Sequence, residues 1–130
     1  MKFLLTISVV CLFGTATFAA EPIVQLDVVY TKVDSTELKL DFYRPAGDGP
    51  FPLIICIHGG GWCAGSKGDY KDFQKNMANA GYASASIQYR LAPKNKFPAQ
   101  IDDVTNGLKF LVAEKKKFHI DPTRVAVFGG

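Results

Sequence analysis

Hydrophobic and polar residues alternate with two different periods along the chain, and each period predicts one kind of element. Apolar and polar positions alternate over residues 23–33 and again over residues 38–43, which is typical of strands that bury one face. A polar turn around Asp34 and Ser35 separates the two segments and favours an antiparallel pair. Residues 51–57 point apolar side chains to both faces, which indicates a strand inside a parallel sheet.

Helical spacing dominates two later segments. Between residues 70 and 80 apolar residues recur every three or four positions, with Asp69 as the cap and Gly81 as the stop. A second apolar stripe follows Pro98, with acidic residues early and lysines late, which complements a helix dipole. The members of that second stripe are Ile101, Val104, Leu108, Leu111 and Val112.

Strands are predicted on either side of the second helix, over residues 82–89 and 125–128, with residues 119–124 as a connector. The order is therefore an antiparallel pair followed by strand, helix, strand, helix and strand. This alternation predicts the α/β class, with a mostly parallel sheet flanked by helices and the antiparallel pair at its start.

The composition is that of an ordinary globular chain. The 130 residues are 48% hydrophobic and 21% charged, which suits one domain at most or part of a larger one. The net charge of +3 is small, and the basic run at residues 115–117 falls where a helix is expected to end. We therefore expect no nucleic-acid partner.

The first 19 residues have the pattern of a secretory signal peptide. Lys2 precedes a mostly apolar stretch over residues 3–13, and small residues lead to Ala19 and Ala20. The stretch is too short for a typical membrane helix. We expect cleavage after Ala19, a secreted or periplasmic location, and a folded part over residues 20–130 without membrane attachment.

Removal of this leader takes Cys11 away and leaves Cys56 and Cys63. An exported protein can form disulfides. A bridge here would clamp the loop that carries Cys63 to the apolar strand that carries Cys56. We therefore favour two free or buried thiols over a disulfide, and neither has the spacing of a metal site.

Three consecutive glycines, Gly59 to Gly61, follow the apolar strand at residues 51–57. Such a run adds little to a core and makes physical sense where backbone amides must face a ligand closely. A developing oxyanion is the favoured ligand. Phosphate loops are disfavoured, because residues 65–67 do not complete a Walker pattern and the dinucleotide pattern lacks its last glycine. No cofactor is expected.

Ionisable residues outside this loop have simpler interpretations. The chain has two histidines, and neither lies in a cluster of His, Asp or Glu, so no metal is expected. His58 is predicted to hydrogen-bond the loop backbone, and His119 to be solvated. Asp102 and Asp103 are adjacent, so they point about 100° apart on a helix and are interpreted as helix-start charges rather than paired acids.

Several motifs in order resemble the hormone-sensitive-lipase and feruloyl-esterase-like branches of the α/β-hydrolase superfamily. The nearest likeness is to secreted bacterial esterases of the BD-FAE type, and it extends from about Ile23 to Gly130. The motifs are Ile57 to Trp62, Tyr89 to Pro93, Phe97 to Gln100 with Asp102 and Asp103, Ile120 to Pro122, and Val127 to Gly130.

The resemblance implies roles for individual residues. The backbone amides of Gly60 and Gly61 would be two donors of an oxyanion hole. Trp62 would either pack beside the acyl pocket or anchor the loop in the core, and Arg90 would organise nearby loops. His58 would support the site structurally.

The last two residues match the beginning of a further motif. Gly129 and Gly130 correspond to the first two positions of the Gly-x-Ser-x-Gly nucleophile elbow. The resemblance therefore implies that residues 20–130 are the N-terminal portion of an α/β-hydrolase, truncated at the elbow. The serine, the acid and the histidine of the triad would all follow later, so this fragment alone is expected to be inactive.

The function implied is a serine-type carboxylic ester hydrolase that acts on a small-molecule or polysaccharide ester, such as an acetylated or feruloylated polysaccharide. Alternatives that the sequence leaves open are an arylformamidase, a peptidase of the prolyl-oligopeptidase kind, and a non-catalytic binding domain that kept the fold. Gln88 and Lys94 depart from the acidic residues common in the family. These departures affect local loop contacts rather than the reaction class.

Overall fold

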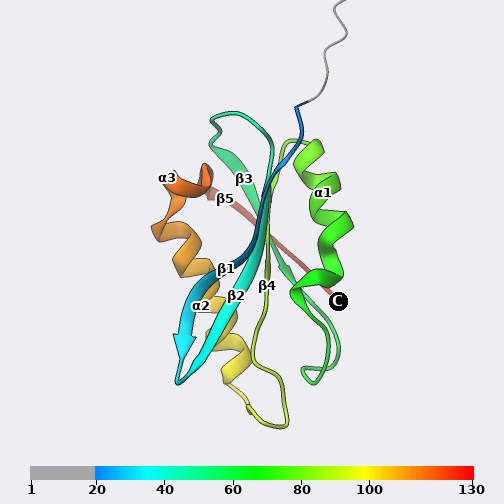
Figure 1. The fold of residues 1–130 in the computed structure, drawn as a ribbon, viewed down its shortest axis with the longest axis vertical. Helices are drawn as coiled ribbons and strands as arrows, with labels where there is room; N and C mark the ends of the chain where they lie inside the picture. Colours follow the sequence, from blue (N-terminus) through cyan, green and yellow to red (C-terminus); the bar gives the residue numbers. More distant parts are fainter. Residues whose placement is uncertain (1–19) are drawn as a thin grey trace, which may run out of the picture.

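The computed structural model describes residues 20–130, and the predicted leader at residues 1–19 lies outside the described residues. Five strands form one sheet in the order β1-β2-β4-β3-β5 (Figure 1). The strands are β1 (Ile23–Val33), β2 (Thr36–Arg44), β3 (Phe51–Ile57), β4 (Ala83–Ile87) and β5 (Ile120–Gly129). The α/β class predicted from the sequence is confirmed.

The sheet is mixed rather than uniformly parallel. β1 pairs antiparallel with β2, and β2 pairs antiparallel with β4. β3 lies between β4 and β5 and is parallel to both, as its apolar sequence predicts. The parallel half therefore consists of β4, β3 and β5, and it places the carboxyl ends of β3 and β5 at the same edge.

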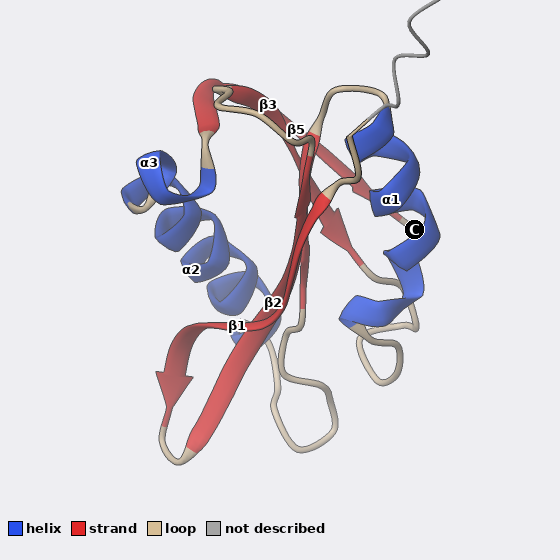
Figure 2. Cartoon of the chain, turned by 45° about the horizontal axis from the view of Figure 1, so that its top comes forward, coloured by secondary structure: helices blue, strands red, loops and turns tan. Residues whose placement is uncertain are grey.

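Helices cover both faces of the sheet, as Figure 2 shows. One face carries α1 (Lys71–Asn79), which is preceded by the short 3-10 helix η1 (Lys67–Tyr70). The other face carries α2 (Ala99–Ala113) and α3 (Lys115–Phe118). Within residues 20–130 no helix combines the length and the apolar character that crossing a bilayer requires.

The helix ends differ from those predicted. The residue that caps η1 is Ser66 and not Asp69. The Asp69 carboxylate completes the capping box by accepting a hydrogen bond from the Ser66 backbone amide. The long helix ends at Ala113, so the lysines at residues 115–117 form the separate helix α3. The first difference arises from side-chain acceptors that bind backbone amides, and the second from backbone hydrogen bonds at the end of α2. The spacing of apolar residues reports neither.

Two strands also differ from the sequence pattern. β5 begins at Ile120 instead of residue 125, and its register against β3 jumps from Asp121 to Val125, so part of the predicted connector belongs to the strand. β2 was predicted to be half-buried, but Asp41 and Tyr43 are buried together with its apolar residues. The prediction fails because β2 lies inside the sheet with helices on both sides.

The core lies where α2 and α3 cover the sheet. Phe118 contacts Phe42 in an edge-to-face arrangement, with 4.8 Å between ring centroids, and it meets Phe110 in the same way. The most deeply buried apolar side chains of this cluster are Leu40, Phe42, Leu53, Ile55, Ile87, Leu111 and Phe118. This packing fixes the strands whose ends carry the glycine loop.

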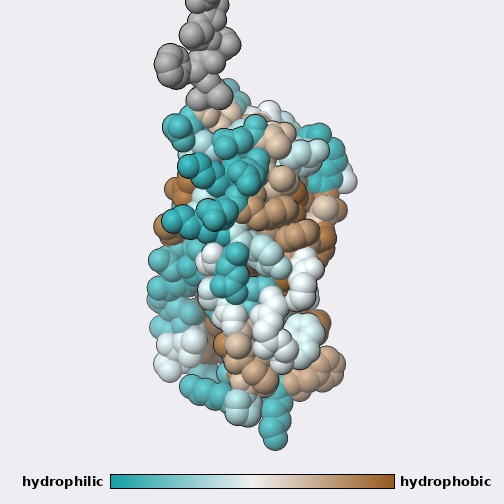
Figure 3. Space-filling model, turned by 90° about the vertical axis from the view of Figure 1, so that its right-hand side faces the viewer, coloured by the Kyte–Doolittle hydropathy of each residue, from teal (hydrophilic) through white to brown (hydrophobic). Residues whose placement is uncertain are grey.

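β5 forms one edge of the sheet and exposes hydrophobic side chains. Val127 is 65% exposed, and Val125 and Phe128 are also exposed. Figure 3 shows hydrophobic surface gathered beside the hydrophilic surface of the α1 side. Unpaired backbone groups next to apolar side chains form a template for pairing with another chain.

We expect the 130-residue chain to self-associate through this edge and the substitution Val127→Lys to reduce the association. A lysine on an edge strand opposes strand addition, and the unfolding free energy should change by less than about 0.5 kcal/mol because the site is exposed. Light scattering against concentration measures the effect. Tyr82→Lys, at another exposed site outside the strands, is the control. Equal scattering by both variants would contradict the assignment of the edge.

Candidate active site at the glycine loop

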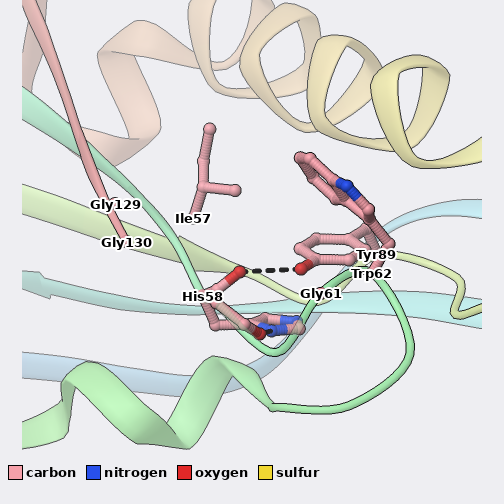
Figure 4. Close-up of a pocket in the computed structure, with 8 residues that line it drawn as sticks. Ile57, His58, Gly61, Trp62, Tyr89, Gly129 and Gly130 are labelled. Carbon is pink, nitrogen blue, oxygen red and sulfur yellow. Dashed lines mark hydrogen bonds between the residues drawn. The ribbon is translucent and has the colours of Figure 1, made fainter.

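The glycine loop and the end of β5 enclose a cavity of about 360 Å³ at the carboxyl edge of the parallel strands (Figure 4). Ile57, the last residue of β3, is paired with Gly129, the last residue of β5. Ligands bind outside the carboxyl ends of strands in open α/β sheets. The cavity is lined by Ile57, His58, Gly59, Gly61, Trp62, Tyr89, Gly129 and Gly130.

The backbone of the glycine loop and the backbone at the end of β5 lie in close contact across this cavity. A Cβ atom added to Gly59 would lie 2.7 Å from the carbonyl oxygen of Gly130. A Cβ atom added to Gly129 would lie 2.7 Å from the carbonyl oxygen of Ile57. Only glycine permits this separation, so the structure brings together the two glycine motifs that lie far apart in the sequence.

The loop itself turns sharply after Gly59. The backbone φ angles of Gly60, Gly61 and Trp62 are 109°, 60° and 66°. The carbonyl oxygen of Gly60 accepts hydrogen bonds from the amides of Cys63 and Ala64, each 3.1 Å long. In the part of the chain that the structure describes, the amides of Gly60 and Gly61 donate to no backbone or side-chain acceptor. They are available to a ligand.

His58 and Tyr89 support the loop from beneath. Their rings stack with 4.1 Å between centroids and 8° between planes, and both side chains are buried. The Tyr89 hydroxyl donates a 2.7 Å hydrogen bond to the His58 carbonyl oxygen, drawn in Figure 4. His58 Nδ1 lies 3.0 Å from the Gly59 carbonyl oxygen, so this nitrogen carries the proton. Burial raises the pKa of the Tyr89 hydroxyl.

Trp62 lies at the mouth of the cavity. Its side chain is 55% exposed, so the interpretation that it anchors the loop in the core is wrong. Its carbonyl oxygen accepts a 2.9 Å hydrogen bond from the Ala92 amide. This bond ties the glycine loop to the segment that follows β4.

Arg90 is held by Asp103, and this pair corrects the interpretation of Asp103 as a helix-start charge. Asp103 is fully buried and accepts hydrogen bonds from Arg90 Nε at 2.8 Å, from Arg90 Nη2 at 2.8 Å and from the Arg90 amide at 2.9 Å. Its neighbour Asp102 is exposed, because adjacent helical residues point about 100° apart. The hydrogen bonds to Asp103 raise the pKa of the Arg90 guanidinium.

Lys67 anchors the end of the glycine loop through an ion-pair cluster that the sequence pattern does not predict. Its ammonium lies 2.8 Å from Asp41 Oδ1 and 3.0 Å from Asp27 Oδ1. Its amide donates a 3.0 Å hydrogen bond to Gln88 Oε1, so the departure at Gln88 has a structural role. Burial opposes the charge of Lys67, but the hydrogen bonds to Asp41 and Asp27 outweigh it and raise its pKa. No local pattern could have revealed partners on β1 and β2.

The remaining candidate residues lie apart from the cavity chemistry. Cys56 and Cys63 are free, as predicted; burial raises the pKa of the Cys56 thiol to about 12, whereas Cys63 is exposed. His119 Nδ1 lies 2.7 Å from the Asp48 carbonyl oxygen, so its ring is tied to a loop rather than simply solvated. Across residues 20–130 no group of three or more His, Cys, Asp or Glu could hold a metal ion.

The chain is similar in fold to solved structures of esterases. The chain superposes on a bacterial heroin esterase with a TM-score of 0.70 and 32% identity, covering 84% of this chain and 34% of that one. It superposes on esterase B from Lactobacillus rhamnosis with a TM-score of 0.75 and 28% identity, covering 84% of this chain and 36% of that one. The fold is therefore that of the α/β-hydrolase esterases.

Sequence comparison narrows this class to a family. The BD-FAE family model matches residues 40–130, and the chain belongs to the BD-FAE family. An ethyl acetate hydrolase of Pseudomonas putida is 34% identical over 85% of this chain and 36% of its own length. Neutral cholesterol ester hydrolase 1 of Rattus norvegicus is 36% identical over 90% of this chain and 30% of its own length. The chain thus spans about a third of the length of these relatives.

The Arg90–Asp103 pair predicts a large difference between two adjacent positions. Asp103→Ala should lower the unfolding free energy by about 3 kcal/mol, because it leaves the Arg90 charge without its partner. Removing one partner of a buried ion pair typically costs about 3–5 kcal/mol of unfolding free energy. We expect the lower value because the Arg90 side chain is 20% exposed and water can partly solvate its charge. Asp102→Ala should change it by less than about 0.5 kcal/mol. Urea denaturation measures both, and equal losses would contradict the assigned ion pair.

Proposed function

We propose that this chain forms the oxyanion-binding part of a serine-type carboxylic ester hydrolase. The observation that carries the proposal is the pair of unpaired amides, Gly60 and Gly61, beside a cavity whose far wall is Gly129 and Gly130. A carbonyl oxygen bound there gains negative charge as a tetrahedral intermediate forms. Amide donors placed before the reaction stabilise that charge, and loss of one donor typically costs about 3–4 kcal/mol.

The nucleophile is proposed to follow Gly130 in the complete protein. Within residues 20–130 neither His58 nor His119 hydrogen-bonds to a serine or a carboxylate, so the described residues hold no assembled triad. A serine directly after Gly130 would stand at the end of β5, next to the glycine loop. Its hydroxyl would attack the ester carbon, a histidine would take the proton and return it to the leaving alcohol, and a carboxylate would orient that histidine. The 130-residue chain alone should not turn over esters.

Short esters are the proposed substrates, either of small molecules or of polysaccharides. The name of the Pseudomonas putida relative, an ethyl acetate hydrolase, supports a small acyl group. The cavity beside the glycine loop has a volume of about 360 Å³, which suits a group of modest size.

Two glycine substitutions in the full-length protein test the oxyanion assignment. Gly60→Ala would push its Cβ atom into the Ala64 carbonyl and displace the loop amides, so kcat for p-nitrophenyl acetate should fall about 10²–10³-fold. Gly61→Ala meets no atom within 4 Å and keeps its amide, so only the cost of positive φ, about 1–2 kcal/mol of stability, is expected.

Thermal unfolding of both variants separates loss of catalysis from loss of fold. Labelling by a serine-directed phosphonate is expected at the residue after Gly130. Absence of a nucleophilic residue at that position, or ester turnover that the phosphonate leaves intact, would disprove the serine mechanism.

The proposal extends to export of the protein. Residues 1–19 should direct secretion, and N-terminal sequencing of protein from the medium or the periplasm should begin at Ala20. Ala19→Arg should block cleavage, because the site requires a small residue, while a chain starting at Ala20 should remain in the cytoplasm. Recovery of the chain with Met1 intact in the cytoplasm would contradict export.

A further inference from the structure

A bulge interrupts the pairing of β1 with β2. The register of the two strands shifts between Gln25 and Val28. Leu26 and Asp27 therefore share one partner position on β2, that of Asp41. The backbone φ angle of Asp27 is 56°, a left-handed conformation that residues other than glycine seldom adopt. Bulges are frequent next to active sites, where they change the direction of a side chain.

The bulge directs Asp27 toward Lys67. The Asp27 amide, which the bulge removes from the strand ladder, donates a 2.9 Å hydrogen bond to Asp41 Oδ1. The Asp27 carboxylate lies 3.0 Å from the Lys67 ammonium, and Asp41 Oδ1 lies 2.8 Å from the same ammonium. A strained backbone conformation persists only where the surrounding structure holds it. Here the surrounding contacts place two carboxylates around one ammonium.

Lys67 is also fixed through its backbone. Its amide donates a 3.0 Å hydrogen bond to Gln88 Oε1. The carbonyl oxygen of Gln88 in turn accepts a 2.8 Å hydrogen bond from the Tyr30 hydroxyl on β1. The end of the glycine loop is therefore tied to β1, to β2 and to the segment after β4.

The residues just before Lys67 lie against the peptide groups of the two candidate oxyanion donors. A Cβ atom on Gly65 would collide with the Gly59 carbonyl oxygen. The Ala64 amide donates a 3.1 Å hydrogen bond to the Gly60 carbonyl oxygen. These two carbonyl groups belong to the same planar peptide groups as the amides of Gly60 and Gly61. A displacement of residues 64–66 would therefore rotate both donors.

We propose that Lys67, held by Asp41 and by the bulged Asp27, is a positioning residue for the oxyanion amides. The inference rests on the proposed ester hydrolysis at the glycine loop. Lys67 does not line the cavity, so it acts through residues 64–66 and not on the substrate. The amides bind the oxyanion of the transition state more strongly than the carbonyl oxygen of the substrate. Loss of their position should therefore lower kcat and leave KM nearly unchanged.

Removal of the ammonium in the full-length enzyme tests this role. Lys67→Met keeps an unbranched side chain without the charge, so kcat for p-nitrophenyl acetate should fall about tenfold while KM stays within about twofold. Lys67→Arg should restore kcat to within about threefold of the unmodified enzyme, because a guanidinium can bind both carboxylates.

Asp27→Gly separates positioning from stability. Glycine adopts a φ angle of 56° without strain, so the melting temperature should not fall. Loss of the carboxylate should still lower kcat, by about threefold, because the Asp27 side chain is 63% exposed and its ion pair is partly screened. A purely structural role would change the melting temperature and kcat in the same direction.

Arg124→Met is the matched control. Arg124 forms a 2.7 Å ion pair with Asp121 near the amino end of β5, whereas the glycine loop lies at the carboxyl end of the parallel strands. This variant also removes the cation of a close ion pair. It should leave kcat within about twofold.

The outcomes separate this inference from the proposed function. Ester turnover with an unchanged kcat in Lys67→Met would overturn the positioning role and leave ester hydrolysis standing. Equal losses of kcat in Lys67→Met and Arg124→Met would also overturn it, because they would reflect a general loss of stability. If Lys67→Met does not fold, Asp27→Gly decides, and an unchanged kcat in that variant would overturn the role. No turnover of any ester by the unmodified enzyme would overturn both proposals.

Discussion

The central constraint of this structure is that two backbone amides must stay unpaired without letting the loop collapse. Gly60 and Gly61 donate to no acceptor within the described residues, and both residues are exposed, so their amides are open to a ligand. A flexible loop would turn these amides toward its own carbonyl groups. The neighbouring residues therefore hold the peptide planes in place with contacts that avoid the amides themselves.

Three anchors share this task. Tyr89 holds the His58 carbonyl from below, and Ala92 holds the Trp62 carbonyl from the side. Lys67 fixes the far end of the loop to β1 and β2 through two carboxylates. Each anchor binds a carbonyl or a side chain of the loop segment, so the donors of Gly60 and Gly61 remain free. This division of labour lets a glycine-rich segment be rigid and still present its backbone to a ligand.

The segment after β4, which carries Arg90 and Ala92, is held in place by the buried carboxylate of Asp103. Asp103 holds both the Arg90 side chain and the Arg90 amide, and Gln100 holds the Arg90 carbonyl. The start of α2 is thereby coupled to the segment that carries Ala92, and Ala92 is coupled to Trp62. One connected set of hydrogen bonds therefore joins the glycine loop, the segment after β4 and the start of α2, which lie in three separate parts of the sequence.

The sequence by itself determined the five strands, the two longer helices, the order in which they occur and the glycine motifs, because periodicity and turn residues are local properties of the chain. The tertiary structure decided which faces are covered and which polar groups find partners. Asp103 has the pattern of a solvated helix start, and Lys67 that of a loop lysine, yet both bind residues far away in the sequence. Trp62 reads equally as a core anchor or a cavity wall until the 55% exposure of its side chain is known. The physical reason is that burial and ion pairing depend on which strands lie side by side, and the spacing of residues within one element carries no record of its neighbours.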